Sequence, residues 1–399
     1  MDAYRNPYTP GAGSRPAALT GRDAEIERFR IAIGRLSRGA TEQGIVIHGL
    51  RGVGKTVLLN KLEEVASDAG WATAFAELRR GDDFRLVMAR ALFNAIRQLD
   101  THRIGRPVIA RVKAAFASFS ATLASDGTIR FGFDVTPTRG TADSGDLETD
   151  LVEMLQELGR AAEQVETGAA ILLDELQLAN RDDLEAFVAA VHRATQKALP
   201  IAVVVAGLPT LPPALAEAKT YAERLFSFPR LGALGEDDAR DALLLPAREE
   251  GVGYDDEALA MLLDRAGGYP YFLQEWGRGA WDVAVANPIS AEDVEAAIPE
   301  VERKLNEDFF AVRLTRATPA ERRYCAVMAG LGDGAQESGA IARSMGYTNV
   351  RAASSLRASL IDKGVLYSVG RGQLDFTVPR FAEFMRSDAA SSDLLTAGS

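Results

Sequence analysis

Four short runs rich in apolar residues constrain the fold of this 399-residue chain more than any other feature. The runs span Gly44–His48, Trp71–Glu77, Ala170–Asp174 and Ile201–Ala206. Hydrophobicity that continues along a run, rather than alternating, is typical of strands covered on both faces. Such strands belong to parallel sheets whose connections are helices. The runs therefore predict an α/β fold, a parallel sheet with flanking helices.

A glycine-rich loop follows the first run and precedes a helix expected from Val57 to Ser67. The loop reads Gly49-Leu50-Arg51-Gly52-Val53-Gly54-Lys55-Thr56. This is the G-x-x-x-x-G-K-[ST] pattern, in which glycines let backbone N–H groups turn toward phosphates and the following helix, here from Val57, adds its positive end. We expect Lys55 to reach the β- and γ-phosphates of ATP and Thr56 to bind Mg²⁺. An accidental glycine turn would not require the strand and the helix on either side.

Two acidic residues end the third run, in the sequence Ile171-Leu172-Leu173-Asp174-Glu175. A phosphate loop needs a second ligand for Mg²⁺ and a group that activates water. We assign Asp174 to the metal and Glu175 to the role of general base, since a carboxylate can accept the proton of water. The alternative is a buried strand followed by the acidic cap of a helix.

Composition changes along the chain predict a series of domains. We expect an irregular segment at 1–20, a phosphate-loop domain at 21–233, a helical lid at 234–316, a winged helix-turn-helix at 317–388 and a disordered tail at 389–399. An α/β insertion at about 79–165 interrupts the phosphate-loop domain. Alternating residues in Ser118–Leu123 and Ile129–Val135, around Asp126-Gly127, predict a hairpin within this insertion.

Taken together, these motifs resemble the AAA+ and STAND branches of the P-loop ATPases, including archaeal-type ATPases and initiator ATPases related to origin recognition proteins. The resemblance covers about residues 15–385. It implies that the segment containing Arg22 packs on adenine and that Pro270, in Gly268-Tyr269-Pro270, touches the base or ribose. It also implies that Arg224 completes a neighbour's γ-phosphate site, in a nucleotide-dependent oligomer. An ordinary helix cap and a surface ion pair are the alternatives for Pro270 and Arg224.

The chain also departs from the pattern of these families. The run Ile201–Ala206 ends without the polar sensor that the resemblance implies, and Thr210 is the nearest polar residue. The lid offers only Arg265 and Arg278 for a second sensor. Slow hydrolysis is therefore expected.

The C-terminal region has the pattern of a winged helix. Thr318-Pro319-Ala320-Glu321 is a capping box with proline at the first helical position. Three helices are expected at Pro319–Gly330, Ser338–Met345 and Asn349–Lys363, and two strands at Val365–Val369 and Gln373–Val378. The region from Arg313 to Arg386 contains eleven Lys and Arg residues and six Asp and Glu residues. Its net charge is therefore +5, whereas the whole chain carries −11.

This basic module suggests duplex DNA as a partner. The residues expected to contact DNA are Asn349, Arg351, Arg357, Lys363 and Arg371. The sequence leaves open that the module docks to a protein instead. The favoured function is an ATP-binding, slowly hydrolysing switch that couples nucleotide state to this module. A DNA-binding regulator with ATP as a structural ligand is the alternative.

The remaining sequence features concern location. The single cysteine, Cys325, allows no internal disulfide and favours a reducing compartment. The first twenty residues hold no apolar core of a signal peptide, and no run approaches the roughly 20 apolar residues of a membrane span. The sequence therefore predicts a cytoplasmic protein that does not insert into membranes.

Overall fold

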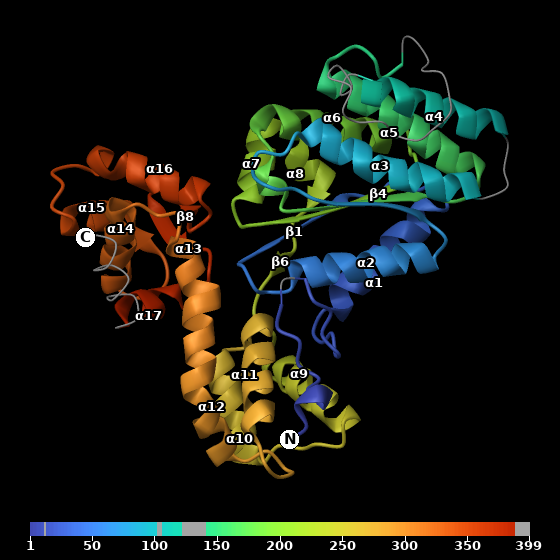
Figure 1. Cartoon of the computed structure of the whole chain (residues 1–399). Helices are drawn as coiled ribbons and strands as arrows, with labels where there is room; N and C mark the ends of the chain where they lie inside the picture. Colours follow the sequence, from blue (N-terminus) through green and yellow to red (C-terminus); the bar gives the residue numbers. More distant parts are fainter. Residues whose placement is uncertain (12, 102–105, 122–140, 388–399) are drawn as a thin grey trace. The chain divides into compact units, whose positions relative to one another are not determined.

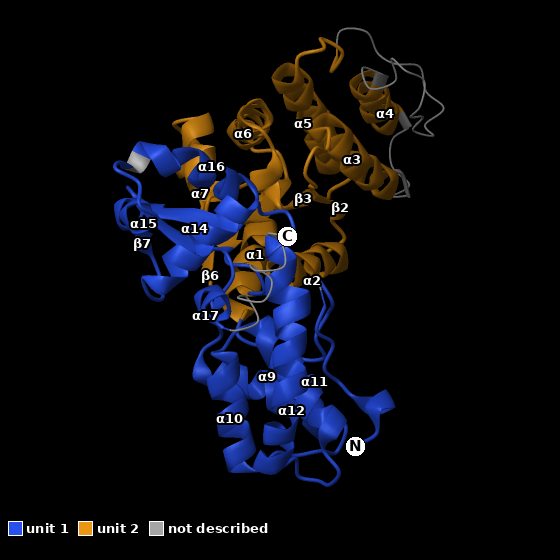
Figure 2. Cartoon of the chain, turned by 60° about the vertical axis from the view of Figure 1, so that its left-hand side comes forward, with its two compact units in different colours: residues 1–21, 49–54, 232–399 blue, residues 22–48, 55–231 orange. Residues whose placement is uncertain are grey.

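The computed structural model describes residues 1–11, 13–101, 106–121 and 141–387. The chain divides into two compact units (Figure 2). The sheet unit comprises residues 22–48 and 55–231, and the helical unit comprises residues 1–21, 49–54 and 232–399. Among the helices of the described residues, none combines the length and the apolar character that crossing a membrane requires.

A parallel sheet with strand order β2-β3-β4-β1-β5 forms the centre of the sheet unit. Its strands are β1 (Gly44–Gly49), β2 (Ala72–Glu77), β3 (Ala169–Asp174), β4 (Ile201–Gly207) and β5 (Phe226–Ser227), and β6 (Arg230–Leu231) also pairs with β1. Every residue of β3 and β4 is buried, as the continuous hydrophobicity of the sequence predicts. Because neighbouring strands are parallel, the residues after β1, β3 and β4 share one edge of the sheet.

Helices cover both faces of this sheet (Figure 1). One face carries α1 (Asp23–Leu36) and α2 (Lys55–Asp68). On the other side lie α3 (Phe84–Thr101), α4 (Arg106–Ala121), α5 (Leu147–Gln164), α6 (Arg181–Gln196), α7 (Leu211–Ala218) and α8 (Ala222–Leu225). The sheet unit is thus the predicted α/β layer structure.

The insertion at 79–165 differs from its prediction, because its described part is helical. Residues 118–121, expected to begin a strand, are the last turn of α4. The apolar positions Val112, Phe116 and Phe119 are all fully buried at helical spacing, and this period outweighs the local alternation. The rest of the expected hairpin lies within 122–140, outside the described residues.

The helical unit begins with the N-terminal segment, which packs on the helices that follow it in the unit. The side chain of Tyr8 is 3% exposed, and its hydroxyl donates to the Leu243 carbonyl at 2.6 Å. The following helices are α9 (Glu236–Glu249), α10 (Asp256–Ala266), α11 (Pro270–Val283) and α12 (Ala291–Lys304), continued by a π-helical segment η3 (Leu305–Ala311) and α13 (Val312–Leu314). These helices lie in the region expected to form the lid, residues 234–316.

A smaller module of helices and an antiparallel sheet ends the described chain. Its helices are α14 (Pro319–Gly330), α15 (Ser338–Ser344), η4 (Val350–Ala353), α16 (Ser354–Asp362) and α17 (Phe381–Arg386). Its strands β7 (Gln336–Glu337), β8 (Leu366–Gly370) and β9 (Gln373–Phe376) pair in the order β7-β9-β8. This arrangement is consistent with the expected helix-turn-helix and hairpin. The tail at 389–399 lies outside the described residues.

Candidate functional site

The glycine-rich loop, residues 49–54, connects the carboxyl end of β1 to the start of α2. Gly52 and Gly54 have φ angles of 81° and 88°, which residues with a Cβ rarely adopt. Lys55 and Thr56 are the first residues of α2, and Lys55 is 7% exposed. The first N–H groups of a helix have no acceptor within the helix. The start of α2 can therefore bind an anion, as the sequence predicts.

Asp174 lies at the same edge of the sheet, as the last residue of β3. Its side chain is 2% exposed, and its carboxylate accepts a hydrogen bond from the Thr56 hydroxyl. Burial raises the pKa of Asp174, and the hydrogen bonds from Thr56 and from the Glu175 backbone N–H partly oppose this effect. Two oxygen groups of the kind that Mg²⁺ prefers are therefore side by side.

Glu175 adopts a left-handed backbone conformation, with φ of 54°. Its carboxylate accepts a hydrogen bond from the Gln177 side-chain amide. The oxygen of the same amide, Oε1 of Gln177, accepts a hydrogen bond of 3.0 Å from the N–H of Leu208. Leu208 is the residue directly after β4. Gly207 leaves the room for this contact, since a Cβ there would lie 2.4 Å from Gln177 Oε1. Gln177 thus links Glu175 to the end of β4.

Sequence reasoning missed Gln177 and named Thr210 as the polar residue nearest the end of β4. Thr210 precedes α7 and its side chain makes no capping hydrogen bond. The only signal in the sequence for Gln177 is its position two residues after Glu175, which is too common a spacing to single it out.

The structure separates Arg224 from the phosphate-loop end of β1. Arg224 lies just before β5, and β5 pairs in parallel with Gly44 and Ile45, where β1 begins. Arg224 therefore lies beside the start of β1 and not beside its phosphate-loop end. Its implied role toward a neighbour stays a prediction.

A different arginine, Arg230, lies near the phosphate-loop end of β1. The N–H of His48, next to the loop, donates to the Pro229 carbonyl at 3.1 Å. Burial lowers the pKa of His48, and the nearby charges of Arg230 and Lys55 lower it further. A backbone hydrogen bond at Phe228 raises this pKa and partly opposes both effects. No local pattern in the sequence distinguishes Arg230 from Arg224.

Within the helical unit, the loop backbone contacts two other segments. The N–H of Tyr271, at the start of α11, donates to the Gly52 carbonyl at 3.2 Å. The N–H of Arg51 donates to the Thr377 carbonyl, directly after β9, at 2.9 Å. Pro270 is the first residue of α11 and so lies beside the contact with Gly52. The loop is therefore hydrogen-bonded to the lid and to the C-terminal module.

The other candidate arginines are either buried or paired. Arg22 is 7% exposed at the start of α1. In the lid, Arg265 pairs with Glu302 at 3.4 Å and Arg278 pairs with Glu275 at 2.7 Å. Both lid arginines are thus held by carboxylates of the lid itself.

The C-terminal module changes the expected set of DNA contacts. Arg351 and Arg371 are exposed and Arg357 is half-buried. Lys363, by contrast, forms an ion pair with Glu321 at 2.6 Å, and the Glu321 side chain is 3% exposed. The Asn349 side chain accepts the Ala352 N–H and caps η4. Lys363 therefore has a structural partner in the module, and Asn349 has a structural role as a cap.

Comparison with protein families gives two matches. Residues 18–205 match the family described as AAA ATPase domain, and residues 307–385 match a family described as a domain of unknown function. No match was found among curated proteins.

Several solved structures resemble the chain. The Walker-type ATPase PABY2304 of Pyrococcus abyssi is 14% identical, with 94% of this chain and 97% of that chain covered and a TM-score of 0.56. The Orc1 protein of Aeropyrum pernix in complex with DNA is 18% identical, with 95% of each chain covered and a TM-score of 0.43. The RuvB branch migration motor of Thermotoga maritima is 14% identical, with 96% and 99% covered and a TM-score of 0.45. Only the first of these scores supports a common fold.

The family match and the fold agree with the site. The match at 18–205 contains the glycine-rich loop, Lys55, Thr56, Asp174 and Glu175. The parallel sheet places the loop and the two carboxylates at one edge. Residues 18–205 of this chain, which carry the glycine-rich loop and both carboxylates, match the AAA ATPase domain family.

Proposed function

We propose that this chain binds MgATP and hydrolyses it slowly, and that nucleotide state is coupled to the C-terminal module. The observation that carries the proposal is the hydrogen bond between Thr56 and Asp174, at the end of the glycine-rich loop. The donor set fits the group, because amides, a lysine, a hydroxyl and a carboxylate match phosphate and Mg²⁺.

In this proposal the backbone of residues 49–57 and Lys55 hold the phosphates, while Thr56 and Asp174 hold Mg²⁺. When bound, Mg²⁺ neutralises charge on the phosphate oxygens. Arg22 and Pro270 contact the base side of the nucleotide. Arg230, near the phosphate-loop end of β1, adds positive charge there. Arg224 completes the γ-phosphate site of a neighbouring copy.

Glu175 is the proposed general base. Its carboxylate accepts the proton of the attacking water, which the amide of a glutamine could not do. The hydrogen bond from Gln177 holds this carboxylate in one orientation. Gln177 is therefore a positioning residue.

The coupling proposal rests on the two backbone contacts of the loop. Because Gly52 is hydrogen-bonded to Tyr271 and Arg51 to Thr377, a loop that rearranges around phosphates must change both contacts. The lid and the C-terminal module therefore respond to the nucleotide.

The proposed partner of the C-terminal module is duplex DNA, which the module binds as a winged helix through Arg351, Arg357 and Arg371. Exposure of Arg351 and Arg371 and the net charge of +5 between 313 and 386 support this partner. A second candidate, docking of a protein to the same module, is favoured by the structural roles of Asn349 and Lys363.

The experiment that tests nucleotide binding replaces Lys55. In isothermal titration of the full chain with MgATP, Lys55→Ala is expected to abolish binding, because a nearly buried cation is removed from the phosphates. Lys61→Ala is the matched control, since Lys61 lies in the same helix and pairs with Glu64 at 2.9 Å. Equal affinity of the two variants would overturn the proposal.

A further inference from the structure

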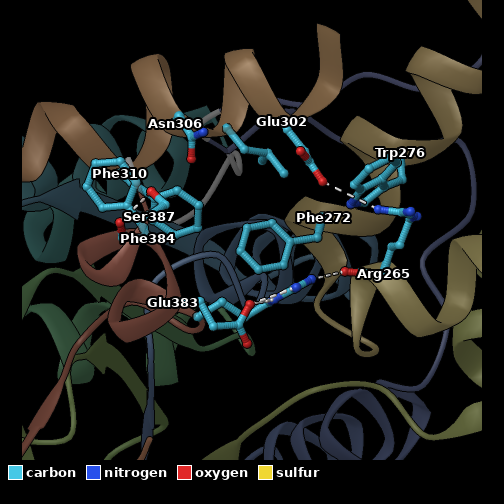
Figure 3. A pocket seen from close by; sticks show the side chains of 11 residues that line it. Arg265, Phe272, Trp276, Glu302, Asn306, Phe310, Glu383, Phe384 and Ser387 are labelled. Atoms are coloured by element: carbon cyan, nitrogen blue, oxygen red, sulfur yellow. Dashed lines mark hydrogen bonds and ion pairs between the residues drawn. The ribbon is translucent and has the colours of Figure 1, made fainter. Parts of the chain in front are cut away.

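A cavity of about 220 Å³ lies in the helical unit, between the lid helices and α17 (Figure 3). Its wall includes the first turns of η3, where Leu305, Asn306 and Phe310 face it. A π-helical segment places side chains differently from an α-helix and is frequent at functional sites. Arg380, which also lines the cavity, has a left-handed backbone with φ of 59°. Neither feature is needed by the proposed nucleotide site.

Aromatic rings form one side of the cavity. Phe310 and Phe384 stack with centroids 5.1 Å apart and an interplanar angle of 16°. Phe272 lies across from them, with its centroid 6.1 Å from that of Phe310 (Figure 3). This side can accept a flat or branched apolar group.

Two ion pairs form the polar side. Arg265 and Glu302 are 3.4 Å apart, and their side chains are 30% and 54% exposed. Arg380 and Glu383 are 2.7 Å apart. The four charges sum to zero, so the cavity favours neither an anion nor a cation. Each ion pair offers one positive and one negative group side by side.

The cavity also contains an unsatisfied donor. Trp276 is 2% exposed, and its indole N–H has no hydrogen-bond partner among the described residues. The Arg265 guanidinium lies over the Trp276 ring, 5.2 Å from its centroid. A buried N–H without an acceptor is rare because it costs free energy, and an oxygen atom of a bound ligand would satisfy this one.

We propose that this cavity binds a free α-amino acid with an apolar side chain. The carboxylate of such a molecule accepts from Arg265 and from the Trp276 N–H, and its ammonium group pairs with Glu302. Its side chain lies against Phe272, Phe310 and Phe384. An ion of a single sign would pair with only two of the four charged groups, and an uncharged hydrocarbon would leave the Trp276 donor unpaired.

An occupant of this cavity would also act on the glycine-rich loop. The rings of Phe272 and Phe309 are 5.4 Å apart, and a Cβ on Gly52 would lie 3.4 Å from Phe309. Tyr271 stacks on Phe309 at 4.5 Å and bonds to Gly52. Binding of an amino acid is therefore expected to change ATP affinity, a consequence that rests on the proposed function.

The first test uses the native full chain and calorimetry. L-phenylalanine and L-leucine are expected to bind, whereas L-phenylalaninamide and N-acetyl-L-phenylalanine, each lacking one charge, are expected to bind at least about tenfold more weakly. L-glutamate and adenosine are not expected to bind. The proposal would be overturned if neither L-phenylalanine nor L-leucine bound. It would also be overturned if L-phenylalaninamide and N-acetyl-L-phenylalanine bound as tightly as L-phenylalanine, or if adenosine bound in place of the amino acids.

The second test uses variants with exposed side chains, which are compatible with folding. Glu302→Gln is expected to weaken L-phenylalanine binding about tenfold or more. Glu300→Gln is the matched control, because Glu300 lies on the same helix and pairs with Arg303 instead. Equal affinities of the two variants would contradict the assigned role. Lys55→Ala distinguishes this site from the nucleotide site. The variant is expected to lose ATP binding and to keep amino-acid binding.

Discussion

At the scale of single residues, Glu175 and Asp174 are adjacent carboxylates with different surroundings. Asp174 is almost completely buried and bonded to Thr56, whereas Glu175 is held by Gln177. Glu175→Gln preserves the shape of the side chain but cannot accept a proton. We expect MgATP affinity to be retained and phosphate release to fall about a hundredfold or more. Phosphate release equal to that of the native chain would favour a structural role for ATP.

Replacing Gln177 tests whether it positions Glu175. Gln177→Ala removes both of its hydrogen bonds, to Glu175 and to the Leu208 N–H. We expect kcat to fall about tenfold, as a catalytic carboxylate loses its orientation, with unchanged MgATP affinity. Gln196→Ala serves as the control, because Gln196 bonds only to Arg193 at the end of α6 among the described contacts. A matching loss in both variants, or none in either, would contradict a positioning role.

The sequence pointed to candidate residues that carry a local pattern and missed candidates whose contacts are distant along the chain. Lys55, Thr56 and Asp174 were identified from the loop and the end of an apolar run, and the structure brings Thr56 and Asp174 together. Gln177 and Arg230 were missed because their contacts are to Leu208 and His48, which lie far along the chain. Such contacts depend on strand order, which the sequence did not predict.

At the scale of elements, the ion pair of Glu321 and Lys363 joins the start of α14 to the end of α16. Burial alone would raise the pKa of Glu321, but hydrogen bonds from Lys363, Ser359 and Thr318 lower it to about 2. An unfolded glutamate has a pKa of about 4.3. The lowered pKa therefore contributes about 3 kcal/mol of stability above pH 4 to 5, and this contribution is lost as the pH falls toward 2.

Glu321→Gln tests this contribution. In urea titrations of the full chain followed by circular dichroism, the variant is expected to unfold at lower urea than the native chain at pH 7. The difference is expected to shrink as the pH falls through 4, since protonation removes the same charge in the native chain. Glu337→Gln, an exposed change in β7, should match the native chain at every pH. A difference that persists unchanged at pH 3 would contradict the assignment.

Elements were predictable where capping signals and one clear period agreed. The helix expected at Pro319–Gly330 matches α14 at both ends, because Thr318, Pro319 and Glu321 mark its start. The strand expected to begin at Ser118 was wrong, because Ser118 and Phe119 belong to the apolar face of α4. The irregular N-terminal segment gave no sign of packing, since Tyr8 finds its acceptor at Leu243, more than two hundred residues away.

At the scale of the whole molecule, charge is distributed unevenly along the chain. The region from Arg313 to Arg386 carries +5 within a chain of net charge −11. Association of such a chain with DNA depends on a few phosphate contacts and weakens steeply with salt, because each contact releases counterions. Binding of duplex DNA by the full chain is therefore expected at low ionic strength and across unrelated sequences.

The salt dependence distinguishes DNA from protein as the partner. Changing Arg351, Arg357 and Arg371 to alanine is expected to lower the slope of log affinity against log salt by about 3, since each phosphate contact accounts for about 0.9. A control that removes equal charge from the lid changes the exposed residues Arg240, Arg248 and Arg303. If only net charge mattered, both triple variants would lose affinity equally. Equal slopes, or no DNA binding by the native chain at low salt, would make the C-terminal module a protein-docking surface, in which the exposed arginines meet carboxylates of a partner.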